Sequence, residues 1–122
     1  MNSYKELASY DLRAAEIFVK YEMWNKAGQE CQQVCEKYLK HYLQANNLLT
    51  KELERTNNFR KLAKAIPDFD KEIVKQLAVV GYYYFETNYP GDNFIELDKE
   101  MAEEAVEIAK RLVGYLEDII LC

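Results

Sequence analysis

Apolar side chains recur every three or four residues along most of this chain, and no other feature of the sequence restricts its fold as much. The clearest stripe spans residues 27–45, where the glutamines and lysines fall away from its centre. This spacing puts the apolar side chains on one face of an α-helix, because a helix repeats about every 3.6 residues. The stripe consists of Ala27, Cys31, Val34, Cys35, Tyr38, Tyr42 and Ala45.

Four other segments show the same kind of pattern, and the chain has only four glycines and two prolines to form turns. A first helix is predicted over roughly residues 3–22, with Leu7, Tyr10, Ala14, Ile17, Phe18 and Tyr21 on its buried face. Later helices are predicted from 56–58 to Pro67, from Asp68 or Asp70 to about residue 85, and from Asp98 to the C-terminus, while Asn25 can cap the second. About five helices with short connections predict an all-α, up-and-down antiparallel bundle, in a single domain over residues 1–122.

The charge and hydropathy of the chain exclude several classes of function. A net charge of −5 argues against a protein that binds DNA or RNA by itself, because such proteins usually carry excess Lys and Arg. The longest apolar run, residues 77–85, is too short to span a bilayer, and residues 1–12 lack the apolar segment of a secretory signal. An odd set of cysteines (Cys31, Cys35 and Cys122) is typical of reduced thiols. We therefore expect a cytoplasmic protein without membrane contact or autonomous DNA binding.

Patterns that carry catalysis or bind metals are missing from the sequence. Cys31 and Cys35 could supply two ligands of a tetrahedral metal site, but His41 is the only histidine and there is no second cysteine pair. His41 is also distant in sequence from any arginine or aspartate that would complete a nucleophilic site. The glycines are isolated, so no phosphate-binding loop is present. We expect no catalytic residue, no metal and no cofactor.

The predicted fourth helix ends in a segment, Gly81–Phe85, that is apolar on every side. Such a segment is usually enclosed by the core or by another subunit. The last helix has a second apolar row at Ala102, Ala109, Val113, Leu116 and Ile120. Because monomers rarely expose a large apolar patch, these features predict a homodimer. The alternative is that the loop over residues 86–97 folds back over the aromatic side chains within one subunit.

A small ligand would find its candidate contacts among the tyrosines and lysines. The ligand-binding candidates are Lys37, Lys40, Tyr83, Tyr84, Tyr89 and Asp92. The tyrosines can stack on a base or another ring, although packing in the core or in a dimer is the simpler interpretation. The lysines also fit a solvated helix surface.

Four motifs follow one another in a familiar order: Asp11–Ala15, Gln32–Lys40, Thr56–Leu62 and Tyr89–Asp92. This order, with a long amphipathic helix at the end, resembles the HEPN family of small helical bundles over nearly the whole chain. The resemblance implies a bundle that commonly dimerises. It also implies one of two functions. Some members are metal-independent ribonucleases with an arginine followed by a histidine a few residues later, and others lack this pair and act with a separate minimal nucleotidyltransferase, often in toxin–antitoxin modules.

The sequence departs from the ribonuclease pattern at three places. No arginine stands at the required distance before His41. The segment Thr56–Phe59 reads Thr-Asn-Asn-Phe where such proteins usually have Thr-His-Asp-Leu, and the Tyr-Pro turn follows Asn88 instead of an arginine. These departures favour a non-catalytic dimeric binding module that acts with a nucleotidyltransferase partner and takes a nucleotide ligand. A divergent ribonuclease and a small-ligand-binding bundle remain the alternatives.

Overall fold

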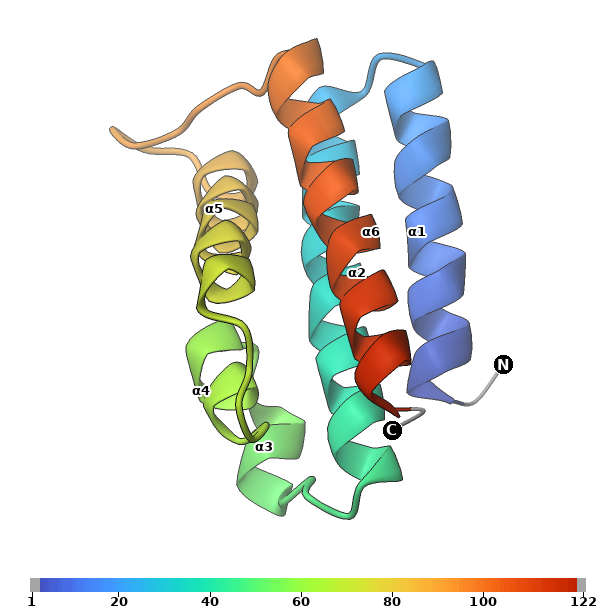
Figure 1. The fold of residues 1–122 in the computed structure, drawn as a ribbon. Coiled ribbons are helices and arrows are strands. Elements are labelled where there is room, and N and C mark those ends of the chain that lie inside the picture. The colour runs from blue at the N-terminus through green and yellow to red at the C-terminus, as the bar shows by residue number, and fades with distance from the viewer. Residues whose placement is uncertain (1–2, 121–122) are drawn as a thin grey trace.

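The computed structural model describes residues 3–120, and within this range the chain forms six α-helices and no strand (Figure 1). The helices are α1 (Tyr4–Lys20), α2 (Trp24–Ala45), α3 (Lys51–Arg55), α4 (Phe59–Lys64), α5 (Lys71–Asn88) and α6 (Lys99–Ile120). The four long helices run up and down, with α3 and α4 stacked end to end below α5. The predicted all-α antiparallel bundle is therefore confirmed.

The cap residues explain where most helices begin. Of the predicted alternatives, Asn58 caps α4 by accepting from the Lys61 amide at 3.2 Å, and Asp70 caps α5 by accepting from the Glu72 amide at 2.8 Å. Asp98 accepts from the Met101 amide at 2.8 Å at the start of α6, as predicted. These side chains satisfy amide groups that the first helical turn leaves without a partner.

Two local predictions about helix starts were wrong or incomplete. The cap position of α2 is Met23, and the Asn25 side chain instead accepts a hydrogen bond from the Leu97 amide at 2.7 Å. The five-residue helix α3 was not predicted. It begins because the Thr50 hydroxyl accepts from the Leu53 amide at 3.1 Å, and it is too short for a periodic apolar pattern to reveal it.

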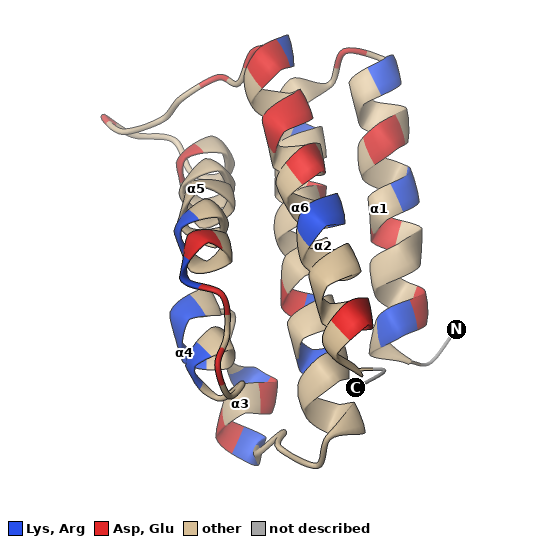
Figure 2. Ribbon diagram, in the orientation of Figure 1, with Lys and Arg blue, Asp and Glu red and all other residues tan. Residues whose placement is uncertain are grey.

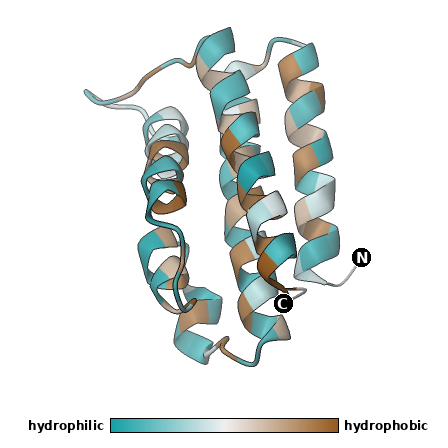
Figure 3. Ribbon diagram, viewed as in Figure 1, coloured by the Kyte–Doolittle hydropathy of each residue, from teal (hydrophilic) through white to brown (hydrophobic). Residues whose placement is uncertain are grey.

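The helix α2 lies at the centre of the bundle and packs against α1, α5 and α6 (Figures 1 and 3). Of the predicted stripe, Ala27, Cys31, Val34, Cys35 and Tyr38 are buried, whereas Tyr42 is half-buried and Ala45 is exposed. Gln32 and Lys40, which were predicted to lie away from the stripe, are also buried. Leu39 and Leu43 of the same helix belong to one core cluster with Leu112 and Leu116 of α6. The core therefore forms around the stripe that dominates the sequence.

The buried faces of the first and last helices differ from those predicted. On α1, Tyr10, Ile17 and Tyr21 point into solvent and are 59, 48 and 67% exposed. The buried face of α1 is instead lined by Ala8, Asp11 and Ala15. Two alanines leave room for α1 to lie close to α2, and the aspartate can be buried because it is paired. The bulkiest apolar side chains of α1 consequently lie outside the core.

The second apolar row of α6 was expected to lie at a dimer surface, and most of it lies in the core of one chain. Ala102, Ala109 and Leu116 are completely buried, because α6 packs against α1, α2 and α5 together. A helix with neighbours on three sides needs a broad apolar face. This row therefore gives no support for association between subunits.

The loop between α5 and α6 is fastened at its ends and leaves the aromatic side chains of α5 uncovered. The Ile95 amide donates to the Glu86 carbonyl at 3.0 Å, and the Leu97 side chain rests on Gly28 of α2. An added Cβ at Gly28 would lie 2.6 Å from Leu97 Cδ1, so glycine permits this approach. Tyr82 and Phe85 stay 53 and 58% exposed, so the loop does not enclose them.

Candidate functional site

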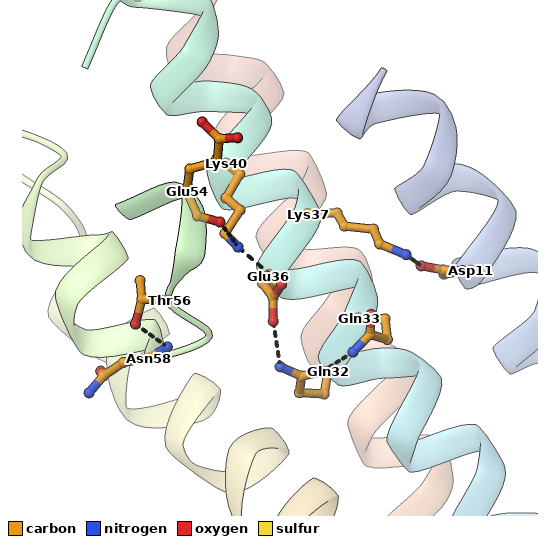
Figure 4. Close-up of polar contacts among 9 residues, drawn as sticks. All are labelled: Asp11, Gln32, Gln33, Glu36, Lys37, Lys40, Glu54, Thr56 and Asn58. Carbon is orange, nitrogen blue, oxygen red and sulfur yellow. Dashed lines mark hydrogen bonds and ion pairs between the residues drawn. The ribbon is translucent and has the colours of Figure 1, made fainter. Parts of the chain in front are cut away.

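A chain of polar side chains runs along α2 toward the short helix α3 (Figure 4). Lys40 is 5% exposed, and its Nζ donates to Glu36 Oε2 at 3.1 Å and to the Glu54 carbonyl at 2.8 Å. Glu36 also accepts from Gln32 Nε2 at 3.1 Å through its other oxygen. A buried ammonium needs such partners, because an unpaired charge in the interior is costly. Lys40 thus joins α2 to the C-terminal end of α3 and has no exposed surface for a ligand.

Lys37 points to the opposite side of α2, toward α1 (Figure 4). Its Nζ lies 2.5 Å from Asp11 Oδ2, in an ion pair that is largely shielded from solvent. Glu30 lies beside this pair, and burial, followed by the negative charge of Asp11, raises the pKa of its carboxyl group. The two lysines predicted to contact a ligand are therefore both paired with carboxylates, on different sides of one helix.

Tyr83 faces α6, where its hydroxyl donates to Glu104 Oε1 at 2.9 Å. Burial, followed by the hydrogen bond to the Glu104 carboxylate, raises the pKa of Tyr83 to about 12. The ring itself is buried in the core cluster. This tyrosine fastens α5 to α6 and presents no open face on which a base could stack.

A groove with a volume of about 860 Å³ lies beside α4 and α5. Its lining includes Gln32, Phe59, Arg60, Lys75, Tyr82, Tyr84 and Phe85. The walls are mainly apolar, and cationic groups stand at the end nearer to α4. Sites of this size and composition can hold a small organic molecule or an apolar side chain from another protein.

The structure separates the six ligand-binding candidates. Of them, Tyr84 lines this groove, whereas Tyr89 and Asp92 lie together at a second hollow formed by the loop after α5. Tyr83, Lys37 and Lys40 each have a partner within the chain, as described above. The candidates therefore do not form one site.

His41 has an environment that suits a structural side chain. Its ring makes an edge contact with Tyr38, with centroids 5.3 Å apart. Burial, and next the positive charge of Lys5, lowers the pKa of His41. A lowered pKa favours the neutral imidazole, which can accept a proton but does not act as a strong proton donor.

Two features are absent from residues 3–120, the part of the chain that the structure describes. No three His, Cys, Asp or Glu side chains in this range are grouped so that they could hold a metal ion. No helix in the same range has both the length and the apolar character needed to cross a membrane. Cys31 and Cys35 are buried free thiols, and burial raises the pKa of Cys31 to about 12.

Sequence reasoning missed the residues that surround the groove on the outer side of α5. Lys75 and Phe85 of α5 and Arg60 of α4 all line it. A signal was present, because Val74, Ala78, Tyr82 and Phe85 recur at helical spacing and form a second row beside the buried one. The pattern could not show which of the two rows would face the core.

Comparison with known proteins gives a consistent result. A family model described as the HEPN domain matches residues 1–119. The fold is similar to the crystal structure of TT1696 from Thermus thermophilus, with a TM-score of 0.80 and 22% sequence identity, covering 94% of each chain. It is also similar to ST0689, described as an archaeal HEPN homologue, with a TM-score of 0.77 and 18% identity, covering 98% of this chain and 99% of that one. The comparison with curated proteins found no match.

Proposed function

Because this chain belongs to the HEPN domain family, we propose that it is a non-catalytic, cytoplasmic binding module that forms a homodimer and acts with a minimal nucleotidyltransferase. Such a pair would belong to a toxin–antitoxin-like or nucleotide-related system. The observation that carries the proposal is the row of exposed aromatic side chains on α5, which neither the core nor the following loop covers. A protein that works through association needs an apolar surface of this kind.

The side chains that could perform chemistry support a non-catalytic role. No arginine precedes His41 at the family's spacing, and Lys37 and Lys40 are held in ion pairs. The groove walls offer aromatic rings and two exposed cations, Arg60 and Lys75, with no histidine beside them. This arrangement suits recognition better than proton transfer.

The partner can be tested by co-expression. The tagged chain is produced together with the minimal nucleotidyltransferase encoded beside its gene, and the two are purified through the tag. We expect co-elution that survives size-exclusion chromatography. A Tyr82→Asp/Phe85→Asp double variant should reduce it, while a Tyr10→Asp/Tyr21→Asp variant, which changes the exposed face of α1, serves as the matched control. Absence of such a neighbouring gene, or separate elution of the two proteins, would contradict the partner.

We also propose that the chain binds a nucleotide, with one of the six candidate residues as its main contact. Among the six candidate residues, Tyr84 has the position that fits best, because it lines the same groove as Arg60. Aromatic stacking on a base and a cation near a phosphate would act together there. Calorimetry with adenosine monophosphate tests this arrangement. Binding should weaken about tenfold in Tyr84→Ala and remain unchanged in Tyr89→Ala, and equal binding by all three proteins would contradict a site in this groove.

A further inference from the structure

The loop after α5 folds back onto the last turns of that helix and leaves two hollows there. The Phe94 amide donates to the Gly91 carbonyl at 3.2 Å, and the Ile95 amide donates to the Glu86 carbonyl at 3.0 Å. Gly91 has φ of 147°, a conformation that glycine adopts without steric cost. The hollows have volumes of about 470 and 230 Å³, and both are lined by Glu86, Asp92, Asn93 and Phe94. The two hollows therefore adjoin each other.

The carboxylate of Glu86 lacks a partner among the residues that the structure describes. The side chain is half-buried, and no hydrogen bond or ion pair joins its oxygens to another group in residues 3–120. Glu86 also lines the groove that contains Arg60 and Lys75, but neither cation pairs with it, and Lys75 lies 3.7 Å from Glu72 instead. A half-buried carboxylate has lost part of its hydration, so a cation that donates hydrogen bonds to it is favoured.

The sequence around this carboxylate is acidic. Residues 76–98 contain four acidic residues and no lysine, arginine or histidine. Figure 2 accordingly shows acidic residues and no basic one on the loop between α5 and α6. A phosphate or another anion would be repelled here. The described carboxylates are also not grouped in threes around a position for a metal ion. The charge therefore favours an organic cation.

Aromatic rings surround the same hollows. Phe85 and Tyr89 line the smaller one, with ring centroids 6.3 Å apart and ring planes inclined by 39°. Phe94 lines both hollows, and Tyr89 and Phe94 are 59 and 43% exposed. The face of an aromatic ring attracts a cation through its quadrupole. Exposed rings beside an unpaired carboxylate are consequently suited to a flat cation that can stack and donate at the same time.

We propose that the smaller hollow binds a guanidinium group, which donates to Glu86 and Asp92 and stacks on the ring of Tyr89. A guanidinium is planar and more weakly hydrated than an ammonium, and its donors lie in the plane that stacks. A quaternary ammonium would fit the rings but has no proton to donate to the carboxylates. The group could belong to an arginine side chain of another protein or to a free molecule such as L-arginine. This site does not rest on the partner or the nucleotide proposed above, because neither proposal uses Glu86 or Asp92.

Titration of the ¹⁵N-labelled chain, followed by NMR, tests the site with N-acetylarginine amide as the probe. We expect the amide signals of residues 85–95 to shift and those of residues 57–60, in the groove beside α4, to stay in place. N-acetylcitrulline amide, which has the same shape without the charge, should cause no shift. Glu86→Gln should weaken binding at least about tenfold, and Tyr89→Leu about threefold. The matched control is Glu96→Gln, which removes an exposed carboxylate of the same loop that lines neither hollow and should leave binding unchanged.

Two probes of equal net charge distinguish the sources of the guanidinium. Tighter binding of L-arginine than of N-acetylarginine amide would assign the site to a free small molecule, and the reverse order or equal binding would assign it to an arginine side chain of a protein. The proposal would be overturned by equal binding of the citrulline analogue, by undiminished binding to Glu86→Gln, by tighter binding of N-acetyl-trimethyllysine amide, or by no shift at millimolar probe. None of these measurements involves the nucleotidyltransferase, so a negative result leaves the proposed partner untouched. Circular dichroism of each variant confirms that it is folded.

Discussion

Tyr38 is the single side chain that best tests which face of α2 is buried. It is 3% exposed, in the centre of the predicted stripe. Tyr38→Asp should lower the free energy of unfolding by at least about 3 kcal/mol, because it buries a charge without a partner and leaves a cavity. The matched control is Tyr10→Asp on α1, where the side chain is exposed, and its cost should stay below about 1 kcal/mol. Urea denaturation measures both, and similar losses in the two variants would show that the buried faces are misassigned.

Tyr83 gives the structure a measurable dependence on alkaline pH. Its pKa is raised from 10.0 to about 12 in the folded chain, first by burial and then by Glu104. The stabilisation that it contributes is therefore fully present below pH 10, and it is lost as the pH rises through about 12. Unfolding free energies of the wild type and Tyr83→Phe should accordingly converge as the pH rises above 10. An unchanged difference between the two proteins from pH 9 to pH 11.5 would show that the tyrosine titrates normally.

At the scale of single elements, the end of α1 contains backbone strain that one substitution can remove. Glu22 has φ of 60°, in the left-handed region, and its amide and that of Met23 donate back to carbonyls of α1. Glycine adopts this conformation without steric cost. Glu22→Gly should therefore raise the free energy of unfolding by about 0.5 to 1 kcal/mol, whereas Glu22→Ala should not. Thermal unfolding of both variants measures the difference. A gain in stability in Glu22→Ala as well would show that the stabilisation comes from removing the negative charge of Glu22 and not from relieving backbone strain.

The elements also show how far the sequence could predict the fold. Long helices with one clear apolar row, above all α2, were predicted correctly because burial on one face repeats with the helical period. On α1 the same rule selected the wrong row, since Ala8 and Ala15 bury little area and the buried Asp11 looks like a surface residue. The ion pair between Asp11 and Lys37 joins α1 to α2. The two residues are 26 positions apart in sequence, so no local pattern reveals their pairing.

The candidate site was less predictable than the fold for a related reason. Tyr83 and Tyr84 are neighbours in sequence, yet one hydroxyl faces α6 and the other side chain lines the groove. Lys37 and Lys40 likewise point to α1 and to α3. Residue type suggests which chemistry is available, but the direction of each side chain depends on which helices pack against α2 and α5. Only the tertiary arrangement determines that.

At the scale of the whole molecule, the main question is whether the chain cleaves RNA as some HEPN proteins do. We expect the purified protein to leave single-stranded RNA intact, with no more cleavage than a buffer control. Catalysis of this kind needs a proton donor and a cation near one phosphate. Burial and the charge of Lys5 lower the pKa of His41, which disfavours the protonated form that would donate a proton. Lys37 and Lys40 are already paired with Asp11 and Glu36.

The assay should use a 5′-labelled RNA and include His41→Ala, prepared in parallel, as the control for contaminating nucleases. Cleavage of equal size in the wild type, His41→Ala and Tyr84→Ala would come from contamination and would leave the prediction intact. Cleavage by the wild type that disappears in His41→Ala would contradict it, because His41 is the only histidine of the chain. Cleavage that persists in His41→Ala but disappears in a Tyr84→Ala variant would likewise contradict a non-catalytic role. That result would place the chemistry in the groove beside α4 and α5, where Arg60 and Lys75 are the nearest cations.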